Sequence, residues 1–291
     1  VLANLEPAER PRAHADAEAA PARGDGIFDD MDRAIAAAAA AHEQLMAMTL
    51  EERERIIAAM RAAALEHAEE LAELACRETG MGRPADKAAK NRLVARKTPG
   101  TEILQPRAFT GDRGMTLAER APYGLVGAIT PSTNPTSTII CNAIGLVAAG
   151  NAAVFNAHPG ARVCSGRSVS LLNQAIVGAG GPPNLVTALA EPTIASAQAL
   201  MAHPAIRLLV VTGGPGVVRE AMHCGKKAIC AGPGNPPAVV DETADVGRAA
   251  RDIIAGASFD CNVVCVLEKE IIAVNAIADR LQEELERLGA V

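Results

Sequence analysis

Aromatic residues make up only 2% of this 291-residue chain, which has no tryptophan and one tyrosine. Its core must therefore be built from Ala, Val, Ile and Leu. The seven cysteines form no CxxC pair and the six histidines are dispersed, so their spacing predicts neither a disulfide framework nor a metal site. The net charge is −6 without a dense basic stripe, which argues against nucleic acid as the main partner.

Long uncharged apolar runs are also missing. None approaches the ~20 residues that cross a bilayer, and no signal-peptide pattern is present. We therefore expect no membrane partner and a cytoplasmic location with reduced thiols. With 49% hydrophobic residues, the chain can bury a sizeable core and could form two domains.

The chain divides into three parts by composition. Residues 1–25 are rich in Ala, Pro, Glu and Arg and are predicted to be a flexible tail. Residues 26–240 and 241–291 are expected to form two further parts. Helices are expected from 29 onward, with a capping box at Thr49 opening a long helix that ends at Gly80, and a third helix over 85–97.

After Pro122 short apolar strands alternate with helices. This pattern predicts an α/β fold, a Rossmann-like parallel sheet with helices on both faces. Asp241 and Glu242 are expected to cap the helix that follows them. The expected strands span 125–130, 152–156, 185–189, 208–211, 228–230 and 238–240, and the expected helices 139–149, 165–177, 195–203, 217–223 and 275–288.

Three stretches carry a resemblance to a known family: 127–135 (GAITPSTNP), 231–237 (AGPGNPP) and 258–265 (SFDCNVVC), with weaker support from 154–159 and 79–83. Together they resemble the CoA-acylating aldehyde dehydrogenases, the propionaldehyde and acetaldehyde branch found with bacterial microcompartments. The resemblance implies an aldehyde dehydrogenase-like fold and an oxidoreductase that converts a short-chain aldehyde, CoA and NAD⁺ to acyl-CoA and NADH. It also implies that residues 26–240 hold the N-terminal helices and the NAD- and CoA-binding domain, and that residues 241–291 begin the catalytic domain that carries the nucleophile.

Cys265 is the candidate nucleophile. A thiolate can attack an aldehyde carbon, and the thiohemiacetal can release a hydride to become a thioester. On its residue type alone a cysteine is more often a small buried hydrophobe, and the resemblance is what assigns Cys265 this role. Cys261 stands where the family usually has Asn, and we interpret it as a bystander.

Asn134 is the candidate oxyanion donor. Ser-Thr-Asn-Pro is turn chemistry by itself, but Asn134 matches the family position whose amide stabilises the developing oxyanion. With the backbone N–H of Cys265 it would make a two-donor hole.

A glycine-rich turn over 212–216 lies between an expected strand and helix, where it would accept a pyrophosphate or serve structure alone. His158 stands where hydrolytic relatives carry a Lys that holds the adenosine ribose, which favours NAD over NADP unless it is only a loop histidine. The expected cofactor-binding residues, for NAD and coenzyme A, are Thr130, Pro131, Ser132, His158, Pro159, Gly213, Gly214, Gly216, Gly232 and Gly234.

The loop over 231–237 bears on the acyl acceptor. Aldehyde dehydrogenases that hydrolyse their thioester have a Glu near the place of Ala231, and this loop has no carboxylate. Water attack should then be slow, whereas a thiol needs less assistance because some thiolate exists at neutral pH. Coenzyme A is therefore the expected acceptor.

The sequence stops soon after Cys265, at Val291, whereas members of the family continue for well over a hundred residues. We expect a fragment or a shortened protein with an incomplete catalytic domain. The alternative to an active enzyme is a catalytically silent NAD-binding or assembly module. A zinc-dependent, histidinol-type dehydrogenase is disfavoured by the scattered histidines.

The resemblance also implies a homo-oligomer and a location inside a bacterial microcompartment. Some relatives carry an N-terminal peptide that binds a shell protein, and residues 1–5 could be the end of one.

Overall fold

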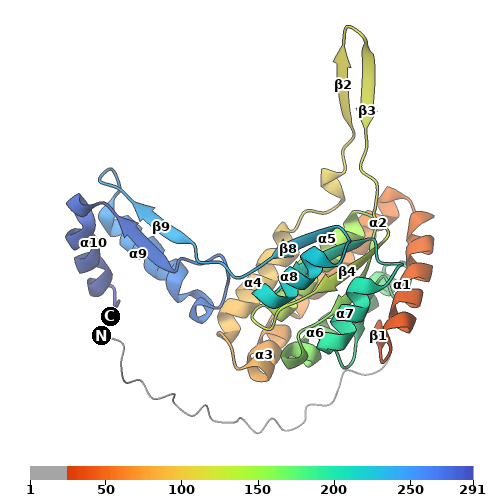
Figure 1. Ribbon diagram of the computed structural model, residues 1–291, viewed down its shortest axis with the longest axis horizontal. Helices are drawn as coiled ribbons and strands as arrows, with labels where there is room; N and C mark the ends of the chain where they lie inside the picture. The colour runs from red at the N-terminus through yellow and green to blue at the C-terminus, as the bar shows by residue number, and fades with distance from the viewer. Residues whose placement is uncertain (1–24, 291) are drawn as a thin grey trace.

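A computed structural model describes residues 25–290. The tail expected over 1–25 and the shell-binding peptide expected at 1–5 lie, apart from Asp25, outside this range. Figure 1 shows a main body around one twisted sheet, a two-stranded hairpin that projects from it, and a small unit on the other side that carries the C-terminus. No helix within residues 25–290 has the length and apolar character needed to span a membrane.

The main sheet has six parallel strands in the order β1-β6-β5-β4-β7-β8. The predicted α/β class is therefore confirmed. Strands β4, β5 and β6 are buried along their whole length, as expected for a sheet covered on both faces. The strands are β1 (Ile27–Phe28), β4 (Leu125–Ile129), β5 (Ala152–Asn156), β6 (Val186–Leu189), β7 (Leu208–Thr212) and β8 (Ala228–Ala231).

Two sets of helices cover the sheet. One set contacts strands β4 to β8 and consists of α1 (Met31–Met46), α7 (Ile194–Ala202) and α8 (Pro215–His223). The other set consists of α5 (Pro135–Ala148), which contacts β5, and α6 (Arg162–Gly178), which contacts β6; these two helices also pack against each other. Helices α2 (Leu50–Glu66), α3 (Ala68–Thr79) and α4 (Pro84–Lys97) form a further layer over α5 and α6. Short 3-10 turns occur at η1 (Thr101–Ile103) and η2 (Pro159–Ala161).

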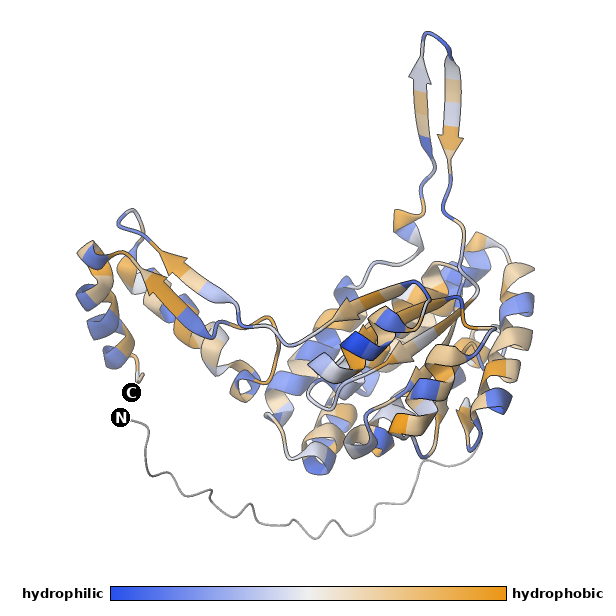
Figure 2. Ribbon diagram, in the orientation of Figure 1, coloured by the Kyte–Doolittle hydropathy of each residue, from blue (hydrophilic) through white to orange (hydrophobic). Residues whose placement is uncertain are grey.

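The core contains Phe155 and otherwise mainly aliphatic side chains and Met, as the low aromatic content requires. Figure 2 shows the apolar colour concentrated on the sheet and on the helix faces that meet it.

The expected helices are present, although α5 begins at Pro135, four residues before the expected start, and α6 at Arg162, three residues before it. The capping box at Thr49 is present, and Gly80 ends α3 in a left-handed conformation with φ 67°. The prediction of one continuous helix from Thr49 to Gly80 was wrong, because His67 leaves helical geometry and ends α2 while starting α3. Its ring contacts the Glu70 carboxylate at 2.6 Å, which orders this break.

The hairpin consists of β2 (Arg107–Gly111) and β3 (Gly114–Ala118), paired antiparallel. All ten of its strand residues are exposed. Phe109, Met115 and Leu117 present apolar side chains to solvent. The sequence analysis predicted no element over this range.

The small unit has its own parallel pair of strands, β9 (Pro237–Val240) and β10 (Glu270–Ala273), covered by α9 (Val246–Ser258) and α10 (Asn275–Arg287). The strand expected at 238–240 exists, but it pairs with β10 instead of extending the main sheet. A separate apolar cluster that includes Val240, Ile253 and Leu281 holds this unit together. The division of the chain at residues 240 and 241 stays a prediction.

Candidate active site

A cavity of about 580 Å³ lies at the carboxyl ends of β4, β5 and β7, where the main sheet meets the small unit. Ligands of open parallel sheets bind at this edge, because the loops that follow the strands converge there. Its walls come from residues in the stretches 129–134, 156–159, 193–197, 212–217, 232–234 and 262–265, together with Lys269. The three stretches singled out in the sequence thus meet in one cavity.

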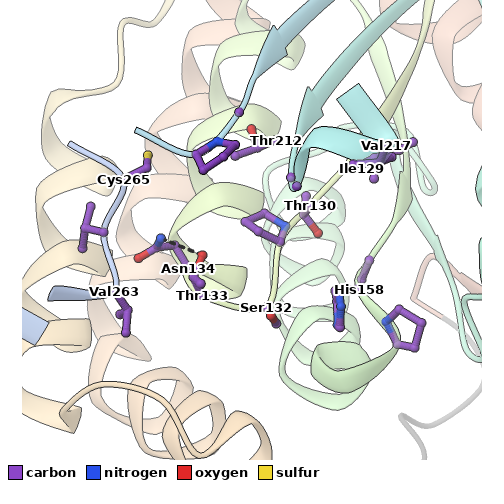
Figure 3. A pocket seen from close by; sticks show the side chains of 18 of the residues that line it. Ile129, Thr130, Ser132, Thr133, Asn134, His158, Thr212, Val217, Val263 and Cys265 are labelled. Carbon is purple, nitrogen blue, oxygen red and sulfur yellow. Dashed lines mark hydrogen bonds between the residues drawn. The ribbon is translucent and has the colours of Figure 1, made fainter. Parts of the chain in front are cut away.

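Cys265 lies at one end of this cavity, in the segment that follows the short η3 turn (Phe259–Asn262). Figure 3 shows its sulfur and the Asn134 amide at the same end of the cavity. The turn before it is unusual, since Asp260, Cys261 and Asn262 all have left-handed φ angles of 45°, 54° and 58°. Asn and Asp tolerate this conformation better than other non-glycine residues. This turn changes the direction of the chain after α9, and Cys265 then lines the cavity.

Asn134 is the N-cap residue of α5, directly before Pro135 at the first helical position. Its side chain does not cap the helix. Instead, Nδ2 donates to Oγ1 of Thr133 at 3.1 Å, and the amide faces the cavity. The backbone of Thr138 closes the first turn by donating to the Asn134 carbonyl oxygen at 3.1 Å. The helix thus holds the Asn134 backbone while the side chain amide is available to a ligand.

The glycine-proline loop approaches the Cys265 backbone closely. A Cβ at Gly234 would lie 2.2 Å from the carbonyl oxygen of Cys265, so only glycine fits there. Gly232, Pro233 and Gly234 line the cavity, and among residues 25–290 no Asp or Glu does. The expectation that Asp241 and Glu242 cap the next helix was wrong, because Asp245 is the N-cap residue of α9. The Asp241 carboxylate instead accepts from the backbone N–H of Thr243 at 2.9 Å. A carboxylate base is therefore absent from the described walls of the cavity.

The opposite end of the cavity has features that fit a dinucleotide. Helix α8 begins at Pro215 after Gly214 and has no side-chain cap, so its N-terminus can receive an anion. The Thr130 hydroxyl is buried without a hydrogen-bond partner and lies on the cavity wall. These observations fit a phosphate-bearing cofactor. No group of three or more metal-ligating side chains occurs within the described part of the chain.

His158 lies at this end of the cavity and caps the η2 turn. Its Nδ1 accepts a hydrogen bond from the Gly160 amide at 3.1 Å. In the neutral ring Nε2 therefore carries the proton and can donate to a hydroxyl. The other predicted cofactor residues also line the cavity except Gly216, which lies in the first turn of α8 and faces a shallow hollow against α7. The lining residues that the sequence analysis did not name include Thr193, Ile194, Ala197, Val217, Val263 and Lys269.

A buried cluster of charges connects the nucleophile turn to α4. Asp260 is completely buried, and its Oδ2 accepts from both Lys87 (3.3 Å) and Lys90. Its Oδ1 accepts from the backbone N–H of Arg83 at 2.7 Å, and its own N–H donates to Asp86 at 2.9 Å. The sequence analysis missed Lys87 and Lys90. The only local sign of a shared role is that the two lysines lie three positions apart and so fall on one face of α4.

The remaining thiols differ from Cys265 in their surroundings. Cys164 is fully buried, and this burial raises the pKa of its thiol far above the usual range. Burial also raises the pKa of the Cys76 thiol, while the nearby lysines Lys87 and Lys90 oppose the effect. Cys261 is exposed on the strained turn and does not line the cavity. Cys265 is thus the one cysteine among residues 25–290 that lines the cavity.

Comparison with known proteins shows which family the chain is similar to. The model of the aldehyde dehydrogenase family matches residues 18–288. An acetylating acetaldehyde dehydrogenase of Escherichia coli is 53% identical over 267 residues, covering 91% of this chain and 57% of the relative. A CoA-propanoylating propanal dehydrogenase of Salmonella typhimurium is 47% identical over 269 residues, covering 92% of this chain and 58% of the relative.

Solved structures give the same result. The propionaldehyde dehydrogenase of Rhodopseudomonas palustris, solved with bound CoA and an acylated cysteine, superposes with a TM-score of 0.87 at 50% identity. A propionaldehyde dehydrogenase from the fucose utilisation microcompartment of Clostridium phytofermentans gives the same TM-score and identity. Each comparison covers 90% of this chain and 60% of the other, so the chain spans little more than half the length of these relatives.

Proposed function

Because this chain belongs to the aldehyde dehydrogenase family, we propose that it takes part in the CoA-acylating reaction of the relatives it resembles. The reaction is aldehyde + CoA + NAD⁺ → acyl-CoA + NADH + H⁺, with a short-chain aldehyde such as propionaldehyde or acetaldehyde. The observation that carries the proposal is that Cys265 and Asn134 share a cavity whose described walls hold no carboxylate.

The first step is attack of the Cys265 thiolate on the aldehyde carbon. The Asn134 amide would donate to the developing oxyanion, and the backbone N–H of Cys265 would be the second donor. Losing one such donor typically costs ~10²–10³ in rate. NAD⁺, when bound, supplies the acceptor for the hydride that leaves the thiohemiacetal. Residues at the other end of the cavity would hold it, with the N-terminus of α8 at the phosphates and Nε2 of His158 at a ribose hydroxyl.

The second step is transfer of the acyl group from Cys265 to the thiol of CoA. His158 lies at the far end of the cavity from Cys265, so it is not placed to activate a water molecule beside the thioester. Lys269 is occupied, because its Nζ donates to the Asn262 carbonyl oxygen at 3.0 Å. A thiol is therefore the favoured acceptor, since it ionises far more readily than water.

Two further proposals concern the location of the protein and its oligomeric state. The named microcompartment origin of one solved relative supports a location inside such a compartment. The exposed apolar side chains of the β2–β3 hairpin support a homo-oligomer, because such side chains favour burial against a partner. Light scattering of the purified chain with Phe109→Ser and Leu117→Ser substitutions tests the oligomer, which should then dissociate.

The activity is tested by NADH formation from propionaldehyde and NAD⁺, with and without CoA, beside a Cys265→Ala control. CoA-dependent turnover that disappears in the control supports the proposal. Equal turnover without CoA contradicts the choice of acceptor. NAD binding without even a single-turnover burst of NADH supports the alternative, a silent nucleotide-binding module.

A further inference from the structure

Lys90 connects the buried charge cluster to the Asn134 amide. It lies on α4, its side chain is only 11% exposed, and its ammonium donates to Oδ1 of Asn134 at 2.5 Å. The same ammonium donates to Oδ2 of the completely buried Asp260. Lys90 therefore contacts both the amide at the cavity and the turn that precedes Cys265.

The chemistry of the ammonium determines which way the amide faces. A lysine ammonium has three donors and no acceptor, so only the oxygen of the Asn134 amide can face Lys90. The nitrogen then lies on the other side, where one of its two hydrogens goes to Oγ1 of Thr133. The second hydrogen remains for a ligand in the cavity. A flipped amide would place its NH₂ against the ammonium and lose the Lys90 contact, whereas the Thr133 hydroxyl can donate or accept and so fits either orientation.

The cluster also leaves positive charge beside the amide. Two buried ammonium groups, Lys87 and Lys90, share the single carboxylate of Asp260. Burial lowers the pKa of Lys90, and the hydrogen bond to Asp260 opposes this and favours the charged form. The charged donor makes a stronger hydrogen bond to Oδ1 than a neutral donor would. It also polarises the amide, and this strengthens the amide N–H as a donor.

We propose that Lys90 is a positioning residue that acts through Asn134, holding its amide nitrogen toward the cavity and strengthening it as the donor to the oxyanion. The inference rests on the proposed function. Its test uses a partial reaction that needs no nicotinamide. The Cys265 thiolate attacks the carbonyl carbon of propionyl-CoA, an oxyanion forms, the carbon–sulfur bond to CoA breaks, and CoA leaves as the thiolate, giving propionyl-Cys265. Intact-mass spectrometry of the 291-residue chain follows the added propionyl group.

Lys90→Met should slow propionylation of Cys265 by about 10- to 100-fold, somewhat less than the ~10²–10³ expected for Asn134→Ala. In the Asn134→Ala background, Lys90→Met should cause no further loss, because the two residues act as one unit. Lys90→Arg, which keeps a charged donor, should recover part of the rate. Alkylation of Cys265 by iodoacetamide passes through no oxyanion, so its rate should change less than about twofold in Lys90→Met.

Lys87→Met is the matched control. It removes an ammonium from the same buried carboxylate but does not touch the Asn134 side chain. If general disruption of the cluster explained the effect, Lys87→Met would slow propionylation as much as Lys90→Met and lower alkylation in parallel. That result would overturn the inference, as would a wild-type rate in Lys90→Met or an undiminished loss in the Asn134→Ala background. Wild-type protein that alkylates but never accepts a propionyl group would instead refute the proposed function itself.

Discussion

Gly234 and Cys265 lie so close that a methyl group on Gly234 would come within 2.2 Å of the Cys265 carbonyl oxygen. The contact joins the glycine-proline loop to the segment that carries the nucleophile. Because backbone atoms form both sides of the contact, neither can move away as a side chain could.

Gly234→Ala should therefore displace the Cys265 segment. We expect a loss of about 1–3 kcal/mol in unfolding free energy, as for other overpacked sites, and at least tenfold slower propionylation of Cys265. Gly232→Ala is the stability control, since nothing lies within 4 Å of its added Cβ. Urea unfolding monitored by circular dichroism compares the two variants. Equal stability of both would contradict the contact.

Ala231→Glu tests the argument from the missing carboxylate. Ala231 is exposed at the end of β8, beside the loop that lines the cavity. A carboxylate there should activate water and speed hydrolysis of propionyl-Cys265 at least tenfold, within the range of general base catalysis. Mass spectrometry after removal of propionyl-CoA measures the decay. Ala231→Gln, with the same size and no charge, should hydrolyse like the wild type, and a gain in both variants would refute the role of the base.

Gly82 and Gly80 offer a second matched pair, at the end of α3. Both have positive φ, at 73° and 67°, but a Cβ at Gly82 would lie 2.1 Å from Oδ1 of Asp260, whereas Gly80 is open. Gly80→Ala should cost about 1 kcal/mol for the left-handed backbone alone. Gly82→Ala should cost at least about 2 kcal/mol, because it also displaces a buried carboxylate. Thermal unfolding of the two variants measures the difference, and an equal cost would mean that Asp260 moves freely.

Cys261→Asn should stabilise the protein. Cys261 has φ 54° and is exposed, and Asn tolerates the left-handed region better than most residues. The expected gain is about 0.5–1 kcal/mol in unfolding free energy, with Cys265 still reactive toward iodoacetamide. A loss of stability would show that the Cys261 side chain makes a favourable contact. Cys261→Ser separates removal of the thiol from relief of strain, and should give no gain.

The Glu70–Arg167 pair predicts a pH dependence of stability. A hydrogen bond of 2.7 Å from Arg167, which joins α6 to α3, lowers the pKa of the Glu70 carboxyl below 4.5. The unfolded chain therefore takes up the proton first as the pH falls. The pair stabilises the fold fully above pH 4.5 and loses this contribution as the pH falls through the lowered value.

The change to test this is Arg167→Gln. Because the pair is partly exposed, it should cost less than about 1 kcal/mol at pH 7. The difference from wild type should shrink toward zero near pH 3. Urea unfolding at both values measures it, and a difference that grows on acidification would contradict the assignment.

Much of the fold follows from local patterns. The strands expected at 125–130 and 152–156 were predicted from short apolar runs and are present as β4 and β5, and the capping box at Thr49 and Gly80 marked helix ends that the structure confirms. The hairpin over 107–118 was not predicted, because its residues are all exposed and show no buried face to give a period. The break at His67 was also missed, since the apolar spacing continues across it.

Part of the candidate site could also be predicted from the sequence. The residue types of the three stretches that meet in the cavity, Cys265 and Asn134 among them, were recognisable in the chain itself. Asn134 follows β4, so its place at the carboxyl edge of the parallel sheet could be predicted, whereas the left-handed turn before Cys265 could not. What these residues do in the reaction remains a prediction that the experiments above address.

Sequence alone determined the alternating α/β order, the aliphatic core and the absence of a carboxylate from the glycine-proline loop. Tertiary structure alone decided that β9 pairs with β10 and that Lys90 reaches both Asn134 and Asp260. The reason is separation along the chain. Lys90 and Asp260 are 170 positions apart, and local periodicity reports which face of a helix is buried but not which distant carboxylate lies against it.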